Sequence, residues 1–66
     1  MKFNNFDTVI LCSDIPDTSL VKGMVGVIID TYTSPFLAYE VEFCNEQGET
    51  LVSLALPENA LQIYCP

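Results

Sequence analysis

The strongest constraint on the fold is the segment YEVEFC, residues 39–44, in which apolar and polar side chains alternate. Successive side chains of an extended strand point to opposite faces of a sheet. We therefore predict a strand here, with Tyr39, Val41 and Phe43 buried and with Glu40 and Glu42 facing water. No segment of the chain has sustained helical spacing of its apolar residues, so the fold class is predicted to be all-β.

Four further segments are predicted as strands because β-branched and apolar residues dominate them: residues 8–12, 24–31, 50–56 and 61–64. Turn-forming residues separate these strands, and residues 57–60 are predicted as a single 3₁₀ turn before the last one. Gly48 is expected to take the left-handed conformation that a short hairpin loop needs. Gly23 and Gly26 are expected to mark a bulge or a bend, where a side chain would collide with a crossing strand.

Five short strands and an apolar content of 50% favour a sheet that is closed on itself. A flat sheet would leave one face wet, and the chain has too many apolar positions for that. We therefore predict a single domain over residues 1–66, a small five-stranded SH3-like barrel; a small OB-like barrel is the alternative. The predicted core consists of Val9, Leu11, Val25, Tyr39, Val41, Phe43, Leu54 and Leu56.

Three segments carry a resemblance to a known family: KGMVGVIID at 22–30, AYEVEF at 38–43 and LALP at 54–57. The chain resembles a family of small uncharacterised bacterial proteins, the domain of unknown function 4926. This resemblance implies an SH3-like barrel in a bacterial cytosol, and it implies no activity. The pattern of strands is also similar to ribosomal and elongation-factor barrels that contact RNA, but those bind through basic residues that this chain lacks.

Charge narrows the choice of partner. Nine acidic residues stand against Lys2 and Lys22 alone, which gives a net charge of −7. Binding to nucleic acid or to an anionic membrane needs cations, so both partners are disfavoured. A basic protein is favoured, and the alternative is that the charge only keeps a small domain soluble.

The residues for catalysis are missing. The chain has no histidine, so the commonest general base is absent and neither a Ser–His nor a Cys–His pair can form. The segment from Gly23 to Gly26 is not a phosphate-binding loop, because the lysine and the helix that such a loop needs do not follow it. Glu40 and Glu42 lie about 7 Å apart on one strand face, where solvated carboxylates are expected. We expect no enzyme activity, no cofactor and no metal.

Cysteine usage points to a reducing compartment. An odd set of three, Cys12, Cys44 and Cys65, cannot pair completely within one chain, and no CxxC unit is present. Cys12 and Cys44 are expected to pack as small apolar residues, and Cys65 is expected to be an exposed thiol. The first residues do not resemble a signal peptide. The chain is therefore expected in the cytoplasm.

These observations predict a small acidic protein-binding module, such as an antitoxin- or immunity-like or accessory subunit that covers a basic protein. The alternative is a structural or regulatory subunit, or a homo-oligomer that associates through an edge strand. Salt-sensitive association would indicate the first, and a largely apolar interface the second. For Phe36, packing into the mouth of the barrel is an alternative to a role in binding. The candidate partner-binding residues are Asp14, Asp17, Asp30, Tyr32, Phe36, Glu40 and Glu42.

Overall fold

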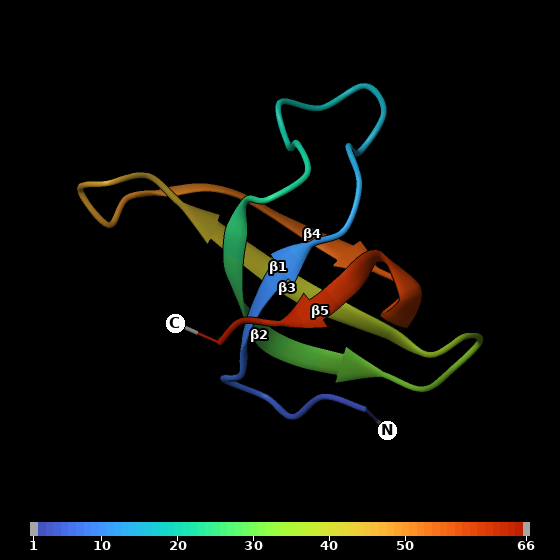
Figure 1. The fold of residues 1–66 in the computed structure, drawn as a ribbon. Coiled ribbons are helices and arrows are strands. Elements are labelled where there is room, and N and C mark those ends of the chain that lie inside the picture. Colours follow the sequence, from blue (N-terminus) through green and yellow to red (C-terminus); the bar gives the residue numbers. More distant parts are fainter. Residues whose placement is uncertain (1, 66) are drawn as a thin grey trace.

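The computed structural model describes residues 2–65 and has an all-β fold, as predicted (Figure 1). The strands and the single 3₁₀ turn are β1 (Thr8–Leu11), β2 (Val25–Tyr32), β3 (Ala38–Cys44), β4 (Thr50–Leu56), η1 (Glu58–Ala60) and β5 (Leu61–Ile63). The predicted strands and the turn before the last strand are thus confirmed, with small differences at their ends. All neighbouring strands pair antiparallel, in the order β4-β3-β2-β1-β5.

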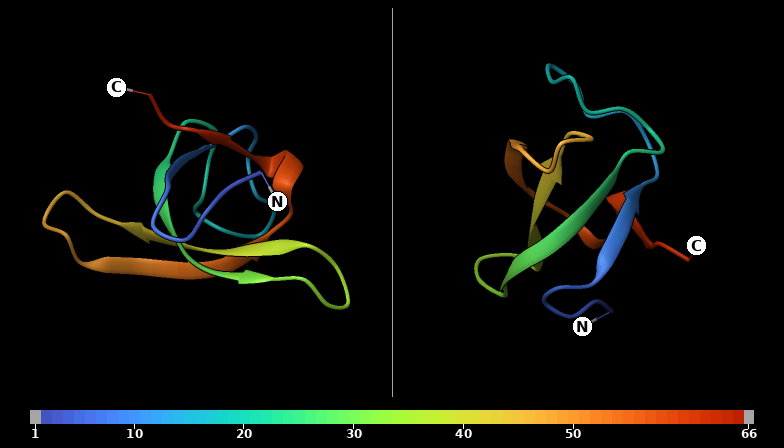
Figure 2. Two further views of the ribbon diagram at one scale, coloured as in Figure 1. Left: turned by 90° about the horizontal axis from the view of Figure 1, so that it is seen from below. Right: turned by 90° about the vertical axis from the view of Figure 1, so that its left-hand side faces the viewer.

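The prediction of a closed barrel is not confirmed, because the five strands form one open sheet with β4 and β5 at its edges. The sheet is nevertheless strongly curved. Figure 2 shows β1 and β5 folded back over the layer that β3 and β4 make. As a result Leu56 of β4 and Leu61 of β5 reach the same hydrophobic core from opposite edges. Curvature and side-chain packing bury the inner face, so apolar burial does not require the two edge strands to pair.

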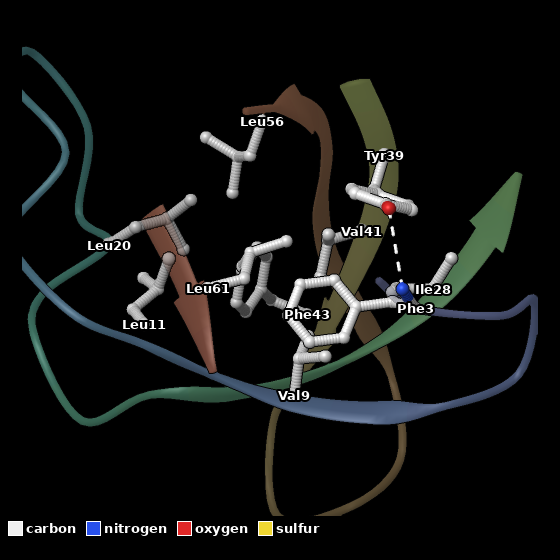
Figure 3. Packing of buried hydrophobic residues seen from close by; sticks show 10 residues of the cluster. All are labelled: Phe3, Val9, Leu11, Leu20, Ile28, Tyr39, Val41, Phe43, Leu56 and Leu61. Atoms are coloured by element: carbon white, nitrogen blue, oxygen red, sulfur yellow. Dashed lines mark hydrogen bonds between the residues drawn. The ribbon is translucent and has the colours of Figure 1, made fainter. Parts of the chain in front are cut away.

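The core consists of ten buried side chains, which come from the inward faces of the strands, from the N-terminal segment and from the β1–β2 loop (Figure 3). They are Phe3, Val9, Leu11, Leu20, Ile28, Tyr39, Val41, Phe43, Leu56 and Leu61. Six of the eight predicted core residues are among them. The prediction that Val25 is buried is wrong, since its side chain is 40% exposed. Because Gly26 faces the core, strand alternation turns Val25 outward. Leu54 is half-buried because its strand is an edge.

Gly26 lies where β2 crosses closest to the core side chains of β3. A Cβ atom at this position would lie 2.7 Å from Val41 Cγ1 and 2.9 Å from Phe43 Cδ1. Both neighbours are fully buried. The predicted collision is therefore real, although it would be with side chains rather than with a crossing backbone. Gly48, in the β3–β4 turn, has φ +81°, as the hairpin prediction required.

Tyr39 ties the N-terminal segment and η1 to the core. Its phenol donates a hydrogen bond to Glu58 Oε2 (3.0 Å) and accepts one from the Phe3 N–H (3.3 Å). The Phe3 ring packs edge-to-face on the Tyr39 ring, with centroids 5.3 Å apart. Figure 3 shows Phe3 lying over the core side chains beside Tyr39. A fully buried tyrosine thus keeps a hydrogen-bonded hydroxyl, which is the condition for burying one at low energetic cost.

The expectation that Cys12 and Cys44 pack as small apolar residues is wrong. Cys12 and Cys44 are exposed rather than packed, because each directly follows an inward-facing core residue, Leu11 and Phe43, and alternation turns it outward. Cys65 is exposed, as predicted. Among the residues that the structure describes, all three thiols are free.

Candidate functional site: the outward face of β2 and β3

The outward face of the two central strands holds four of the seven predicted binding residues. Asp30 and Tyr32 lie on β2, and Glu40 and Glu42 lie on β3. Thr31, Tyr39 and Val41 alternate with them along the two strands, and Tyr39 and Val41 are fully buried on the core side. The prediction that these acidic side chains face away from the core is therefore confirmed, although Glu40 and Glu42 are half-buried rather than freely solvated.

A β-bulge determines which β2 residues reach this face. Ile28 is paired with Val41, and the next pair is Asp30 with Glu40, so Ile29 is an extra residue in β2. Without that extra residue, Asp30 would have the same parity as the fully buried Ile28 and would point into the core. The bulge at Ile29 turns Asp30 outward, and it places Tyr32 on the same face two residues later.

Asp30 and Glu40 form a like-charged pair across the two strands, because the register places them directly opposite each other. Such pairs are destabilising. Hydroxyl groups hold the carboxylate of Glu40 on both sides: the Tyr32 phenol donates to Oε1 (3.1 Å), and Ser53 Oγ donates to Oε2. Asp30 accepts a hydrogen bond from the Thr31 N–H (2.8 Å). These donors offset part of the repulsion and fix the orientation of Glu40.

The hydrogen bond to Glu40 also changes the pKa of the Tyr32 phenol. The carboxylate accepts a hydrogen bond from the protonated phenol and so stabilises that form. The bond therefore raises the pKa of Tyr32 above its ordinary value of 10.0. Partial desolvation and the negative charges of Glu40 and Asp30 act in the same direction. The phenol is therefore a neutral hydrogen-bond donor throughout the physiological range.

Glu42 lies at the centre of the outward face, opposite Val27 on β2 and Ser53 on β4. The Cys44 thiol lies 3.7 Å from Glu42 Oε1 and can donate a weak hydrogen bond to it. Glu40 and Glu42 thus form a short acidic row along β3, two residues apart on one strand face.

Phe36 lies in the loop between β2 and β3 and is 79% exposed. Packing of Phe36 into the mouth of the fold, which was the alternative interpretation, is therefore wrong. Phe3 covers the core instead. The sequence pattern did not indicate this because the N-terminal segment has no strand alternation.

Asp14 and Asp17 are not brought to this face. Both lie in the long loop between β1 and β2, whereas Tyr32 is the last residue of β2 and Phe36 lies in the loop that follows it. Figure 1 shows the two loops at opposite ends of that strand. Eight strand residues separate the ends, a distance on the order of 20 Å. Asp14 Oδ1 accepts a hydrogen bond from the Lys22 N–H (2.8 Å), which stabilises its own loop.

Three apolar residues of this face were missed from the sequence: Val25, Val27 and Ile29, which are 40%, 36% and 38% exposed. With Gly26 and Ile28 facing the core, alternation turns Val25, Val27 and Ile29 outward. Assigning Gly26 to the inward side would have identified all three from the sequence. The bulge is needed only to place Asp30 and Tyr32 on the same face. We call Val25, Val27 and Ile29 the apolar row.

The outward face of β2 and β3 is an exposed surface of mixed apolar and acidic character. Within residues 2–65 there is no pocket, and no group of three or more histidine, cysteine or acidic side chains is arranged to hold a metal ion. In the same part of the chain, no helix has the length and apolar character to cross a membrane. What the face offers is an exposed strip of apolar side chains beside oriented carboxylates.

Comparison with known proteins identifies the family. Residues 5–63 match the domain of unknown function DUF4926, and the protein belongs to this family. No curated protein and no solved structure matches the chain.

Proposed function

We propose that this protein is a small acidic protein-binding module that covers a basic protein partner with the outward face of β2 and β3. An antitoxin-like, immunity-like or accessory subunit is the kind of module proposed. The observation that carries the proposal is the combination of exposed apolar side chains with Asp30, Glu40 and Glu42 on one face of a chain with net charge −7. The same charge disfavours nucleic acid and anionic membranes.

Electrostatic repulsion within the outward face favours the binding of a cationic partner. Asp30 and Glu40 repel each other across the strands. A cationic partner would relieve that repulsion and would also be steered toward the face at low salt. Glu40 needs little reorganisation, because Tyr32 and Ser53 already orient it. Asp14 and Asp17, at the other end of β2, would contribute only to long-range attraction.

The test uses the partner that associates with the native protein. Its affinity is measured at low and high salt for the wild type, for E40Q/E42Q and for the control E46Q/E49Q, which removes the same charge from the exposed β3–β4 turn. We expect weaker binding and a flatter salt dependence for E40Q/E42Q, and a much smaller effect for the control. If the two double variants behave alike, the outward carboxylates serve solubility only.

A second candidate function rests on β4. Thr50–Leu56 is an edge strand without a charged residue or a proline, and its Leu51 is 54% exposed. Natural edges usually carry such residues to block pairing with another chain. A homo-oligomer, or a structural or regulatory subunit of an assembly, would associate through this edge. Sedimentation at increasing protein concentration separates the candidates, since edge pairing would be insensitive to salt and would be abolished by Leu51→Lys.

We also propose that the fold is an SH3-like barrel and that the protein acts in a bacterial cytoplasm. The strand order β4-β3-β2-β1-β5 and the 3₁₀ turn η1 before β5 support the first proposal. Three free, exposed thiols are compatible with a reducing compartment and support the second.

A further inference from the structure

We infer that the partner contacts the outward face through an amphipathic helix that lies along β2, with apolar side chains on the apolar row and cationic side chains over Glu40 and Glu42. This inference rests on the proposed function and specifies the structural element that binds.

Both faces of β2 are apolar. Ile28 is fully buried on the core side, while Val25, Val27 and Ile29 are exposed on the other side. The strand is also the centre of the sheet, with two strands on each side. An antiparallel sheet with one face in water normally alternates apolar and polar side chains along its strands. A central antiparallel strand that is apolar on both faces therefore indicates that its outward face is covered by a further element.

The two sides of the apolar row differ in charge. On the β3 side, Val27 lies directly opposite Glu42, about 5 Å away across the sheet. On the β1 side, Val27 lies opposite Thr8 and Val25 lies opposite Ile10, and neither residue carries charge. A ligand that matches this face therefore needs an apolar strip with cations on one side of it.

The backbone of the ligand must also satisfy its own hydrogen bonds. Both edges of β2 are already paired, with β1 and with β3. An extended segment lying on the face would have no sheet partner for the backbone N–H and C=O groups it turned toward the apolar row. A helix satisfies these groups internally. Its side chains at i and i+4 are about 6 Å apart along the axis, close to the roughly 6.7 Å between alternate residues of a strand.

A second copy of this chain is a poor occupant. Each copy carries a net charge of −7 and only two lysines. Lys22 lies in the β1–β2 loop, and the backbone N–H of Lys2 is bonded to Glu58 near η1. Pairing two of these faces would therefore bring carboxylates against carboxylates, which disfavours association.

The test uses three synthetic peptides of equal length and compares their dissociation constants for the full chain. The first peptide is a helix with a leucine strip and with lysines along one side of that strip. The second has the same composition with the leucines scattered around the helix, and the third carries glutamate in place of lysine. We expect the first to bind about tenfold more tightly than the second, because only it can bury the apolar row, and we expect no binding of the third.

Methyl NMR spectra locate the contact. The signals of Val25, Val27 and Ile29 should shift with the first peptide, and Val27→Ser should remove its advantage over the second. If the second peptide binds this face equally well, the helix inference is overturned and the acidic binding face is retained. If neither lysine peptide shifts these signals, or if E40Q/E42Q binds both as well as the wild type does, the proposed function fails with it.

Discussion

Replacing Gly26 with alanine tests whether close packing between β2 and β3 determines the fold. The added Cβ would lie 2.7 Å from Val41 Cγ1 and 2.9 Å from Phe43 Cδ1 and Cε1. Carbon atoms normally pack at about 3.5–4.0 Å, so these side chains would have to move by roughly 1 Å within a filled core. Overpacking of this kind costs about 1–3 kcal/mol. A domain of this size has a free energy of unfolding of roughly 3–10 kcal/mol, so the loss would be large.

Urea denaturation of Gly26→Ala, Val41→Ala and the double variant measures this effect. Val41→Ala alone should cost about 2 kcal/mol, since it deletes two buried methyl groups and leaves a cavity. The double variant should be less destabilised than the sum of the single variants by about 1 kcal/mol, because the methyl that collides is gone. Backbone strain is not a competing cause, because φ of Gly26 lies outside the left-handed region. Additive changes, or a Gly26→Ala variant that is more stable than the wild type, would refute the argument.

Three further predictions concern the core, the outward face and the thiols. Phe43→Ala should cost about 3–5 kcal/mol by urea denaturation, enough to unfold much of the protein, whereas a loss below about 1 kcal/mol would place Phe43 outside the core. The Tyr32 phenol should titrate above 10.0 by carbon NMR, and Glu40→Gln should lower that pKa. Because the pKa of Tyr32 is higher in the folded state than in the unfolded state, the stability that its hydrogen bond contributes is present below pH 10.0 and is lost as the pH rises through the folded-state pKa. A titration midpoint of Tyr32 that is the same in Glu40→Gln as in the wild type would show that Glu40 is not the cause. All three cysteines should react with a thiol reagent without unfolding, and protection of Cys12 or Cys44 would contradict their exposure.

Much of the fold follows from local sequence pattern. The alternation of Tyr39, Val41 and Phe43 predicts both the strand and its buried face, because a period of two has only one interpretation in a sheet. Gly48 marks its turn for a similarly local reason. In contrast, the burial of Phe3 depends on a distant contact with Tyr39. Nothing in the residues around Phe3 indicates that contact.

The candidate site was harder to predict for two reasons. Strand parity at β2 depends on Gly26 facing inward, so a prediction that places Val25 in the core misses the apolar row. The bulge at Ile29, which turns Asp30 and Tyr32 outward, depends on the pairing of β2 with β3. Loop positions also depend on the topology. Asp14 and Asp17 were grouped with Glu40 by charge, but the β1–β2 loop places them at the other end of the sheet.

The most direct test of the account is a methyl NMR spectrum of the protein with its native partner bound. Binding through the outward face predicts that the signals of Val25, Val27 and Ile29 shift, while those of the core residue Val9 and of Leu51 at the β4 edge stay in place. Shifts confined to Leu51 and its neighbours in β4, with the apolar row unchanged, would contradict it.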